Sequence, residues 1–214
     1  MTKWTFIIIL LFQSCSNPKP KPTEISSSTK QKIQAPDSNQ FQILEKEIII
    51  GDFDGDGTIE SLQETFISLL DSSSIPKYYF ETQEAFEKKQ REIYQLKPNL
   101  TLSSSNPKIE ELLLAKHTQI LGTAWLKNEG DLNNDGNDEI SVVIDWADWS
   151  SVNQCMIYTF KNKKWNELLK FQIHDWEFIE NSFNGFIINL GNEKIVIKTF
   201  DEEINRIEKE IDLN

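Results

Sequence analysis

Short runs of apolar residues, many of them β-branched, alternate with polar segments along most of this chain, a pattern typical of β-strands. Ile48-Ile49-Ile50 leads into one acidic segment, and residues 140–146 leave a second one as Ile-Ser-Val-Val-Ile-Asp-Trp. Both runs are predicted to be strands. Residues 59–70 fit two patterns, because their apolar residues recur at helical spacing while Thr65-Phe66-Ile67 favours a strand. By analogy with the second segment we predict a strand there.

The remaining pattern predicts one clear helix and a series of hairpins. Residues 81–94 are charged, lack Gly and Pro and end shortly before Pro98, as a helix would. Beyond residue 149 the chain is predicted to be antiparallel β, with turns at 161–164 and at Gly191-Asn192. The predicted strands around these turns are 154–160, 165–173, 186–190 and 194–200. The sequence does not decide the secondary structure of the apolar run 109–114, and residues 201–213 fit either a helix or a strand. The predicted fold class is α+β, predominantly antiparallel β with one or two short helices.

Two acidic segments repeat the same pattern of oxygen-bearing side chains. Residues 51–60 read GDFDGDGTIE and residues 130–139 read GDLNNDGNDE, so both fit G-D-x-[D/N]-x-D-G-x-x-E. Counted from the Asp, oxygen ligands at positions 1, 3 and 5, a glycine at 6 and a main-chain carbonyl at 7 suit a hard divalent cation such as calcium. The alternative is an acidic Asp-Gly turn that binds nothing. The repetition of the spacing favours calcium.

An EF-hand is excluded by the end of each motif. That loop closes with a bidentate acid at position 12, and the chain has Gln63 and Val142 there. The acids come instead at position 9, as Glu60 and Glu139. Each loop is therefore predicted to be a shorter metal clip carried between two strands.

Acidic loops of this pattern between two strands resemble the calcium loops of FG-GAP and VCBS repeats, known from integrin-type propellers and bacterial surface proteins. The resemblance covers the two motifs and their flanking strands. It implies calcium held by side chains at positions 1, 3, 5 and 9 and by the carbonyl at 7. The ligands so implied are Asp52, Asp54, Asp56, Thr58 and Glu60 in the first loop, and Asp131, Asn133, Asp135, Asn137 and Glu139 in the second. The first loop is expected to bind more tightly, because Asn133 replaces an acid.

The number and spacing of the motifs bear on the architecture. The two loops start at Asp52 and Asp131, which is too far apart for neighbouring turns of one compact repeat. A propeller needs at least about four blades. We therefore expect no closed propeller within this chain, but one β-rich domain with two metal-clipped strand junctions.

The first residues resemble a bacterial lipoprotein signal. A basic start precedes the apolar run Trp4–Phe12, which is about half the length of a spanning helix. The segment Phe12-Gln13-Ser14-Cys15 resembles a lipobox, which implies cleavage before Cys15 and lipidation of its thiol. Residues 1–14 would be the signal peptide, 15–40 a Pro-, Ser- and Lys-rich disordered tether, and 41–214 a single calcium-binding domain. This predicts a lipid-anchored protein of the bacterial cell envelope.

Composition limits the partners. The chain of 214 residues carries a formal net charge of −12. Such an acidic chain is unsuited to binding nucleic acid or to adhering electrostatically to anionic lipid. We therefore expect it to associate with a membrane only through the lipid anchor. With Cys15 lipidated, Cys155 has no intramolecular partner and is predicted to be a small buried hydrophobe. An envelope protein or a glycan is the expected partner.

Residues 145–149 form the most suggestive cluster for carbohydrate chemistry. Asp145 and Asp148 could transfer protons, and Trp146 and Trp149 could stack on a sugar. In a strand, however, the two acids point to opposite faces. The two histidines, His117 and His174, have no zinc-type spacing. We therefore expect binding rather than catalysis, with glycan binding or hydrolysis at Asp145–Trp149 as the alternative.

Overall fold

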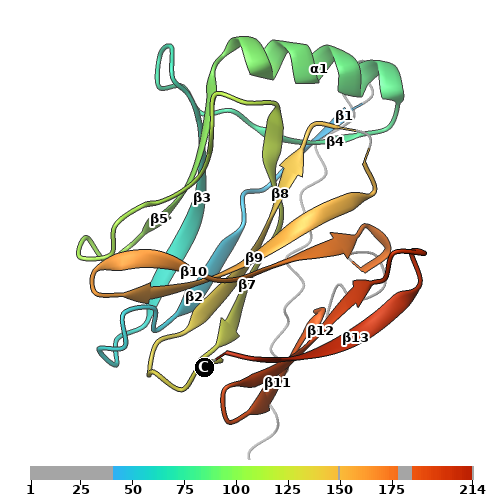
Figure 1. Ribbon diagram of the computed structural model, residues 1–214. Helices are drawn as coiled ribbons and strands as arrows, with labels where there is room; N and C mark the ends of the chain where they lie inside the picture. Colours follow the sequence, from blue (N-terminus) through green and yellow to red (C-terminus); the bar gives the residue numbers. More distant parts are fainter. Residues whose placement is uncertain (1–40, 149, 178–184, 214) are drawn as a thin grey trace, which may run out of the picture. The chain divides into compact units, whose positions relative to one another are not determined.

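The computed structural model describes residues 41–148, 150–177 and 185–213, which form thirteen strands and the helix α1 (Figure 1). Every pairing between the named strands is antiparallel, so the predicted α+β class, predominantly antiparallel, is confirmed. The elements are β1 (Phe41–Leu44), β2 (Ile48–Gly51), β3 (Glu60–Ser68), β4 (Lys77–Phe80), α1 (Gln83–Gln95), β5 (Pro98–Ser104), β6 (Leu112–Lys116), β7 (Ile120–Gly130), β8 (Glu139–Trp146), β9 (Val152–Lys161), β10 (Lys164–His174), β11 (Ile187–Gly191), β12 (Lys194–Phe200) and β13 (Arg206–Asp212).

Two four-stranded meanders dominate the fold. One sheet has the order β2-β3-β5-β6 and the other β7-β8-β9-β10, so each follows the chain from one edge to the other. In both, an acidic loop joins the first strand to the second. A short ribbon of β1 and β4 accompanies the first meander, with β4 and α1 inserted between β3 and β5.

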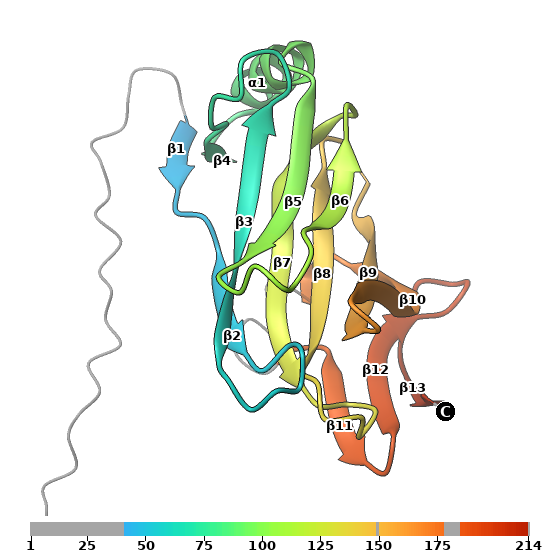
Figure 2. The ribbon, with the colours of Figure 1, turned by 90° about the vertical axis from the view of Figure 1, so that its left-hand side faces the viewer.

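The two meanders pack face to face. Their shared core contains Leu62 and Leu102 from the first sheet and Ile140 and Val142 from the second, all fully buried. A neighbouring cluster combines Phe66, Leu100 and Ile144 with Ile93 of α1. Figure 2 shows β3, β5 and β6 lying over β7 and β8. Buried residues alternate along β3, as a strand requires when one of its faces packs on another sheet.

A third sheet, β11-β12-β13, packs on the other side of the second meander. Its Ile195 and Ile197 meet Val143, Cys155 and Ile157 of β8 and β9. The middle sheet is thus covered on both faces, and β8 is buried from Glu139 to Ile144. Cys155 is a free cysteine with no exposed surface, as the sequence predicted.

Local signals explain why residues 83–95 are helical. The side chain of Thr82 caps the first turn by accepting a hydrogen bond from the Ala85 N–H at 3.3 Å. The helix buries Ala85 and Ile93 and ends just before Lys97, which has a positive φ of 51°. Pro98 cannot continue the helix and instead begins β5. In the described residues no helix is long and apolar enough to cross a membrane.

Each of the three segments whose pattern was ambiguous contains or overlaps a strand. Residues 59–70 contain β3, 109–114 overlap β6, and 201–213 contain β13. The predicted turn at Gly191-Asn192 is displaced by one residue, since Gly191 pairs with Lys194 and the turn residues are Asn192 and Glu193. The predicted signal peptide 1–14, the lipidated Cys15 and the tether 15–40 lie outside the described residues.

Candidate metal centre

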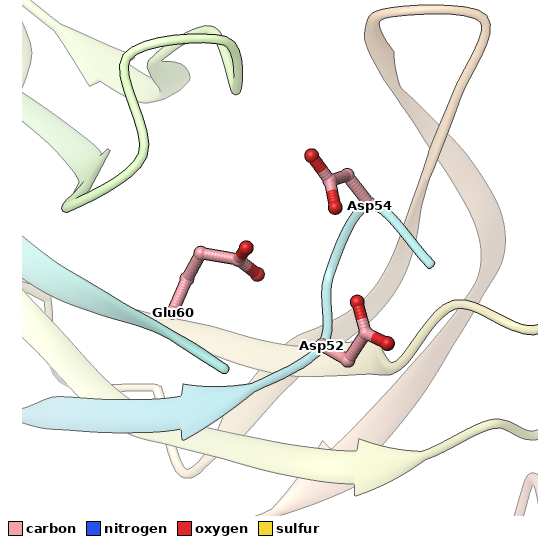
Figure 3. A group of neighbouring side chains, drawn as sticks. All are labelled: Asp52, Asp54 and Glu60. Carbon is pink, nitrogen blue, oxygen red and sulfur yellow. The ribbon is translucent and has the colours of Figure 1, made fainter. Parts of the chain in front are cut away.

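The first acidic loop brings three carboxylates together. Asp52 follows β2, Asp54 lies within the loop and Glu60 opens β3. One oxygen from each lies within 4.8 Å of the other two, and Figure 3 shows the three side chains around one space. Hard divalent cations prefer oxygen ligands at this density. This triad could hold a metal ion.

Hydrogen bonds to the backbone fix the shape of this loop. Glu60 is buried, and its Oε2 accepts the N–H of Phe53 at 3.1 Å. Asp52 Oδ2 accepts the N–H of Gly57 at 2.9 Å. Because Phe53 itself has no exposed surface and packs in the core, the loop is held from inside. Each of these two acids therefore has one oxygen bonded to the backbone of the loop.

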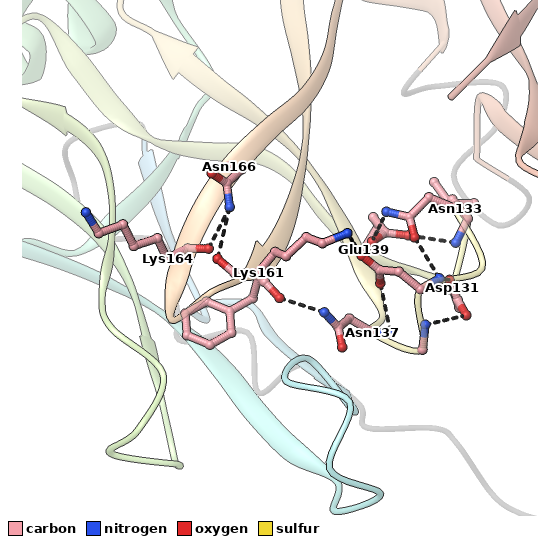
Figure 4. Close-up of polar contacts among 11 residues, drawn as sticks. Asp131, Asn133, Asn137, Glu139, Lys161, Lys164 and Asn166 are labelled. Carbon is pink, nitrogen blue, oxygen red and sulfur yellow. Dashed lines mark hydrogen bonds and ion pairs between the residues drawn. The ribbon is translucent and has the colours of Figure 1, made fainter. Parts of the chain in front are cut away.

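The second loop repeats these bonds at equivalent positions. Glu139 Oε2 accepts the N–H of Leu132 at 2.7 Å, and Asp131 Oδ2 accepts the N–H of Gly136 at 3.0 Å. Leu132 is buried as Phe53 is. Figure 4 shows Asp131, Asn133 and Glu139 gathered in this loop. The two motifs therefore share a conformation as well as a sequence pattern.

The loop interiors also correspond. Asp54 and Asn133 accept from the N–H two residues ahead, at 3.3 and 2.9 Å. Asp56 and Asp135 do the same toward Thr58 and Asn137, at 2.9 and 3.2 Å. The hydrogen bonds from Thr58 hold the pKa of Asp56 below its ordinary value. All ten predicted ligand residues thus stand at equivalent places in two similar turns.

An amide group lies among the acids in each loop, but it comes from a different place. In the first loop Asn106, after β5, donates to Asp54 Oδ2 at 3.1 Å and to Glu60 Oε1 at 3.3 Å. In the second, Asn133 of the loop itself donates to Glu139 Oε1 at 3.1 Å. The first loop therefore keeps an acid at each of positions 1, 3 and 9, whereas the second has two.

One acid in each loop lacks a full set of favourable contacts. Asp52 Oδ1 is buried and has no hydrogen-bond partner within the described part of the chain. Burial raises the pKa of Glu139 to about 7, and repulsion from Asp135 and Asp131 adds to this, while the Leu132 N–H acts in the opposite direction. A cation would give the Asp52 oxygen a partner and would favour the charged form of Glu139. Both observations fit a cation site.

The two loops touch each other, which the sequence did not reveal. The Asp138 N–H donates to the Asp52 carbonyl at 2.8 Å, and the Asp52 N–H donates to Asp138 Oδ2 at 3.0 Å. Asn128 Nδ2 donates to the same Asp138 oxygen and to the Ile50 carbonyl, both at 2.8 Å. Asp138 occupies a loop position that has no ligand role in the motif. Only its extra negative charge could have drawn attention to it.

A cleft of about 600 Å³ opens beside the loops. It lies between the loop residues Asp54, Asp135 and Asn137 and the turn that joins β9 to β10. Three lysines line it, namely Lys108, Lys161 and Lys163. Lys161 Nζ lies 3.4 Å from Asp135 Oδ2. The cleft therefore carries both signs of charge on its walls, beside the apolar side chain of Phe160.

Residues 145–148 lie at the far end of β8 from the second loop. Trp146 is half-buried and packs against the core cluster next to α1, so its indole is largely a packing group. Burial raises the pKa of Asp145 to about 6, against the pull of Lys77. Trp149 lies outside the described residues.

Comparison of the chain with known protein families, with characterised proteins and with solved structures finds no match.

Proposed function

We propose that this chain is a bacterial envelope lipoprotein whose β-rich domain binds two calcium ions and serves as a non-catalytic binding module. The observation that supports the calcium sites best is the equivalence of the two loops. Each has a buried Glu that accepts the N–H of a buried apolar residue, and an Asp that accepts the N–H of the loop glycine. Two separate segments adopting the same acidic turn argue against an accidental charge cluster.

Calcium suits these loops better than other common metals. Their side chains offer carboxylate and amide oxygens, without a His or Cys in either motif. Calcium takes six to eight oxygen ligands with flexible geometry, whereas zinc and copper favour nitrogen and sulfur. The first loop binds the ion more tightly, because it supplies one carboxylate more. The expected affinities are about micromolar to millimolar.

The anchor and the location rest on the N-terminal sequence. The apolar run Trp4–Phe12 and the lipobox-like Phe12–Cys15 support export and lipidation at Cys15, with residues 16–40 as a tether. Calcium at extracellular concentration would then stabilise the domain outside the cytoplasm. The resemblance of the loops to FG-GAP and VCBS repeats fits a role in binding an envelope partner.

Thermal melting of the full chain tests the calcium sites. Saturation at a hundred times the dissociation constant adds about 2.7 kcal/mol for each independent site. We therefore expect a higher melting temperature in millimolar calcium than in chelator. The double variant Asp52→Ala/Asp131→Ala should lose this difference. The exposed Glu202→Ala, away from both loops, is the charge control and should keep it.

An unchanged melting temperature of the unmodified chain across millimolar calcium would contradict the proposal. Magnesium serves as the second control, since it demands near-ideal octahedral geometry, whereas calcium accepts a variable one. A shift in magnesium as large as that in calcium would argue for a general cation effect.

A second candidate function is the binding of an acidic glycan in the cleft beside the loops. The supporting observation is the gathering of Lys108, Lys161 and Lys163 around this cleft in a chain with a net charge of −12. A volume of about 600 Å³ lies within the range of ligand sites. Sulfate or carboxylate groups would pair with the lysines, and Asn137 and Asn162 would hydrogen-bond to hydroxyl groups.

Titration with a sulfated disaccharide and its unsulfated counterpart tests the cleft. We expect the sulfated form to bind at least about tenfold more tightly, a difference of ~1.4 kcal/mol. Lys161→Gln/Lys163→Gln should remove this preference, whereas Lys88→Gln on the exposed face of α1 should not. Equal affinity for the two disaccharides would contradict an acidic glycan as the ligand.

A further inference from the structure

We propose that the two loops act as a single cooperative two-ion centre, in which Asp138 and Asn128 are positioning residues that join the sites. This rests on the proposed binding of calcium at both loops. It adds that an ion at one loop raises the affinity of the other. The basis is the direct contact between the loops, which lie far apart in the sequence but side by side in the fold.

The junction is reciprocal at one residue of each loop. Asp138 donates its N–H to the carbonyl of Asp52 and accepts the N–H of Asp52 on Oδ2, at 2.8 and 3.0 Å. Asp52 is the first ligand of the first loop. Asp138 directly precedes Glu139, the last ligand of the second. One bond therefore joins the backbones of the two loops, and the other joins the Asp52 backbone to the Asp138 side chain.

Asn128 closes the junction from β7. Its Nδ2 donates to Asp138 Oδ2 and to the Ile50 carbonyl, both at 2.8 Å, while its Oδ1 accepts the Gly130 N–H at 2.7 Å. One side chain thus contacts the strand that enters the first loop, the strand that enters the second loop, and Asp138. Removing it would leave the Asp138 carboxylate with one fewer donor.

Side chains of the second motif and of β7 lie close against two glycines of the first motif. A Cβ on Gly51 would lie 2.3 Å from Asn128 Nδ2 and 2.5 Å from Asp138 Oδ2. A Cβ on Gly55 would lie 2.1 Å from Asn137 Oδ1. Interfaces this tight switch between arrangements rather than deforming gradually. Ordering of one loop by an ion will therefore order the other.

The sign of the coupling follows from two opposing effects. Two cations repel each other, which alone would weaken the second binding event. Each ion must also order its loop, and the second ion meets a loop that is already ordered. Asp138 places a carboxylate at the junction, which offsets the repulsion between the ions. Positive cooperativity is therefore expected, and by linkage it is the same in both directions.

Calorimetric titration of the full chain with calcium tests this. Asp52→Ala disables the first loop, which fills first, and we expect the second loop of this variant to bind calcium at least about fivefold more weakly than the second ion binds to the unmodified chain. In the Asp138→Ala background the same change should alter the affinity of the second loop by less than about twofold. Asp138→Asn, which keeps an acceptor oxygen, should restore part of the coupling. Glu202→Ala is the charge-matched control.

The outcomes separate the two proposals. Binding of two ions with equal second-loop affinity in the unmodified chain and in Asp52→Ala would overturn the coupling but leave the calcium sites in place. Failure of the unmodified chain to bind calcium would overturn the proposed function itself. Should Asp138→Ala not fold, Asn128→Ala takes its place, and the comparison of the unmodified chain with Asp52→Ala still decides.

Discussion

Several charged residues lie inside the domain, where burial makes the charged form of a side chain unfavourable. Glu64 is buried, and its Oε2 accepts a hydrogen bond from Thr123 Oγ1 at 2.8 Å. Lys77 Nζ lies 3.8 Å from the same Glu64 oxygen and 2.9 Å from Glu47 Oε1. Asp145 lies near this group without sharing in its close ion pairs. Its pKa is raised to about 6, chiefly by burial and also by repulsion from Asp148, Asp175 and Glu64, against the attraction of Lys77. Its charge therefore opposes folding at neutral pH.

The pH dependence follows from the direction of this shift. The folded chain holds a proton on Asp145 between about pH 4 and pH 6, where the unfolded chain has released it. The destabilisation grows as pH rises through this window and reaches at most about 3 kcal/mol above it. Asp145→Asn should therefore raise the melting temperature at pH 7.5, and the gain should shrink toward pH 4. A gain independent of pH, or a loss at pH 7.5, would contradict this origin.

The acidic triad of the first loop was predictable from the sequence. Its spacing determines which oxygens converge within ten residues, and the triad Asp52, Asp54 and Glu60 is close together as that spacing implies. Asn106 and Asp138 could not be found in the same way. Asn106 reaches the first loop from the turn after β5, and Asp138 reaches it from the other motif. Such contacts depend on how the sheets pack, which no local pattern encodes.

At the scale of the element, strands were recognised where alternation was clear. The two loops are flanked by strands as predicted, and the charged segment 81–94 is helical. The helical spacing around 62–70 was misleading, because Leu62 and Phe66 also fit one face of β3 at a spacing of four. The ribbon of β1 and β4 was not predicted. Its strands are only four residues long, too short for a period to be visible.

The hairpin of β11 and β12 offers a test at this scale. Its turn residues Asn192 and Glu193 have φ of 53° and 63°, a region that Asn tolerates but Glu does not favour. Glu193→Gly should remove this strain and stabilise the chain by a few tenths to about 1 kcal/mol, net of the entropy that glycine adds to the unfolded state. Urea denaturation measures the difference. The exposed Glu202→Gly is the control and should give no gain.

At the scale of the whole domain, the sequence does not reveal which sheets face each other. One strand did carry a sign of it. From Glu139 to Ile144 every residue of β8 is buried, because Ile140, Val142 and Ile144 meet the first meander while Val143 meets the third sheet. The run 140–144, in which Ser141 is the one polar residue, indicates a strand covered on both sides. The partners of its two faces emerge only from the packing.

The meander order also has a consequence for how the chain folds. In both large sheets each strand pairs with the next strand of that sheet along the chain, so most pairings close short loops. The longest closure within a sheet runs from β3 across β4 and α1 to β5. Loop-closure entropy grows slowly with length, and chains dominated by local pairings cross a lower entropic barrier. Each half of this domain can therefore form its sheet from its own segment before the sheets dock.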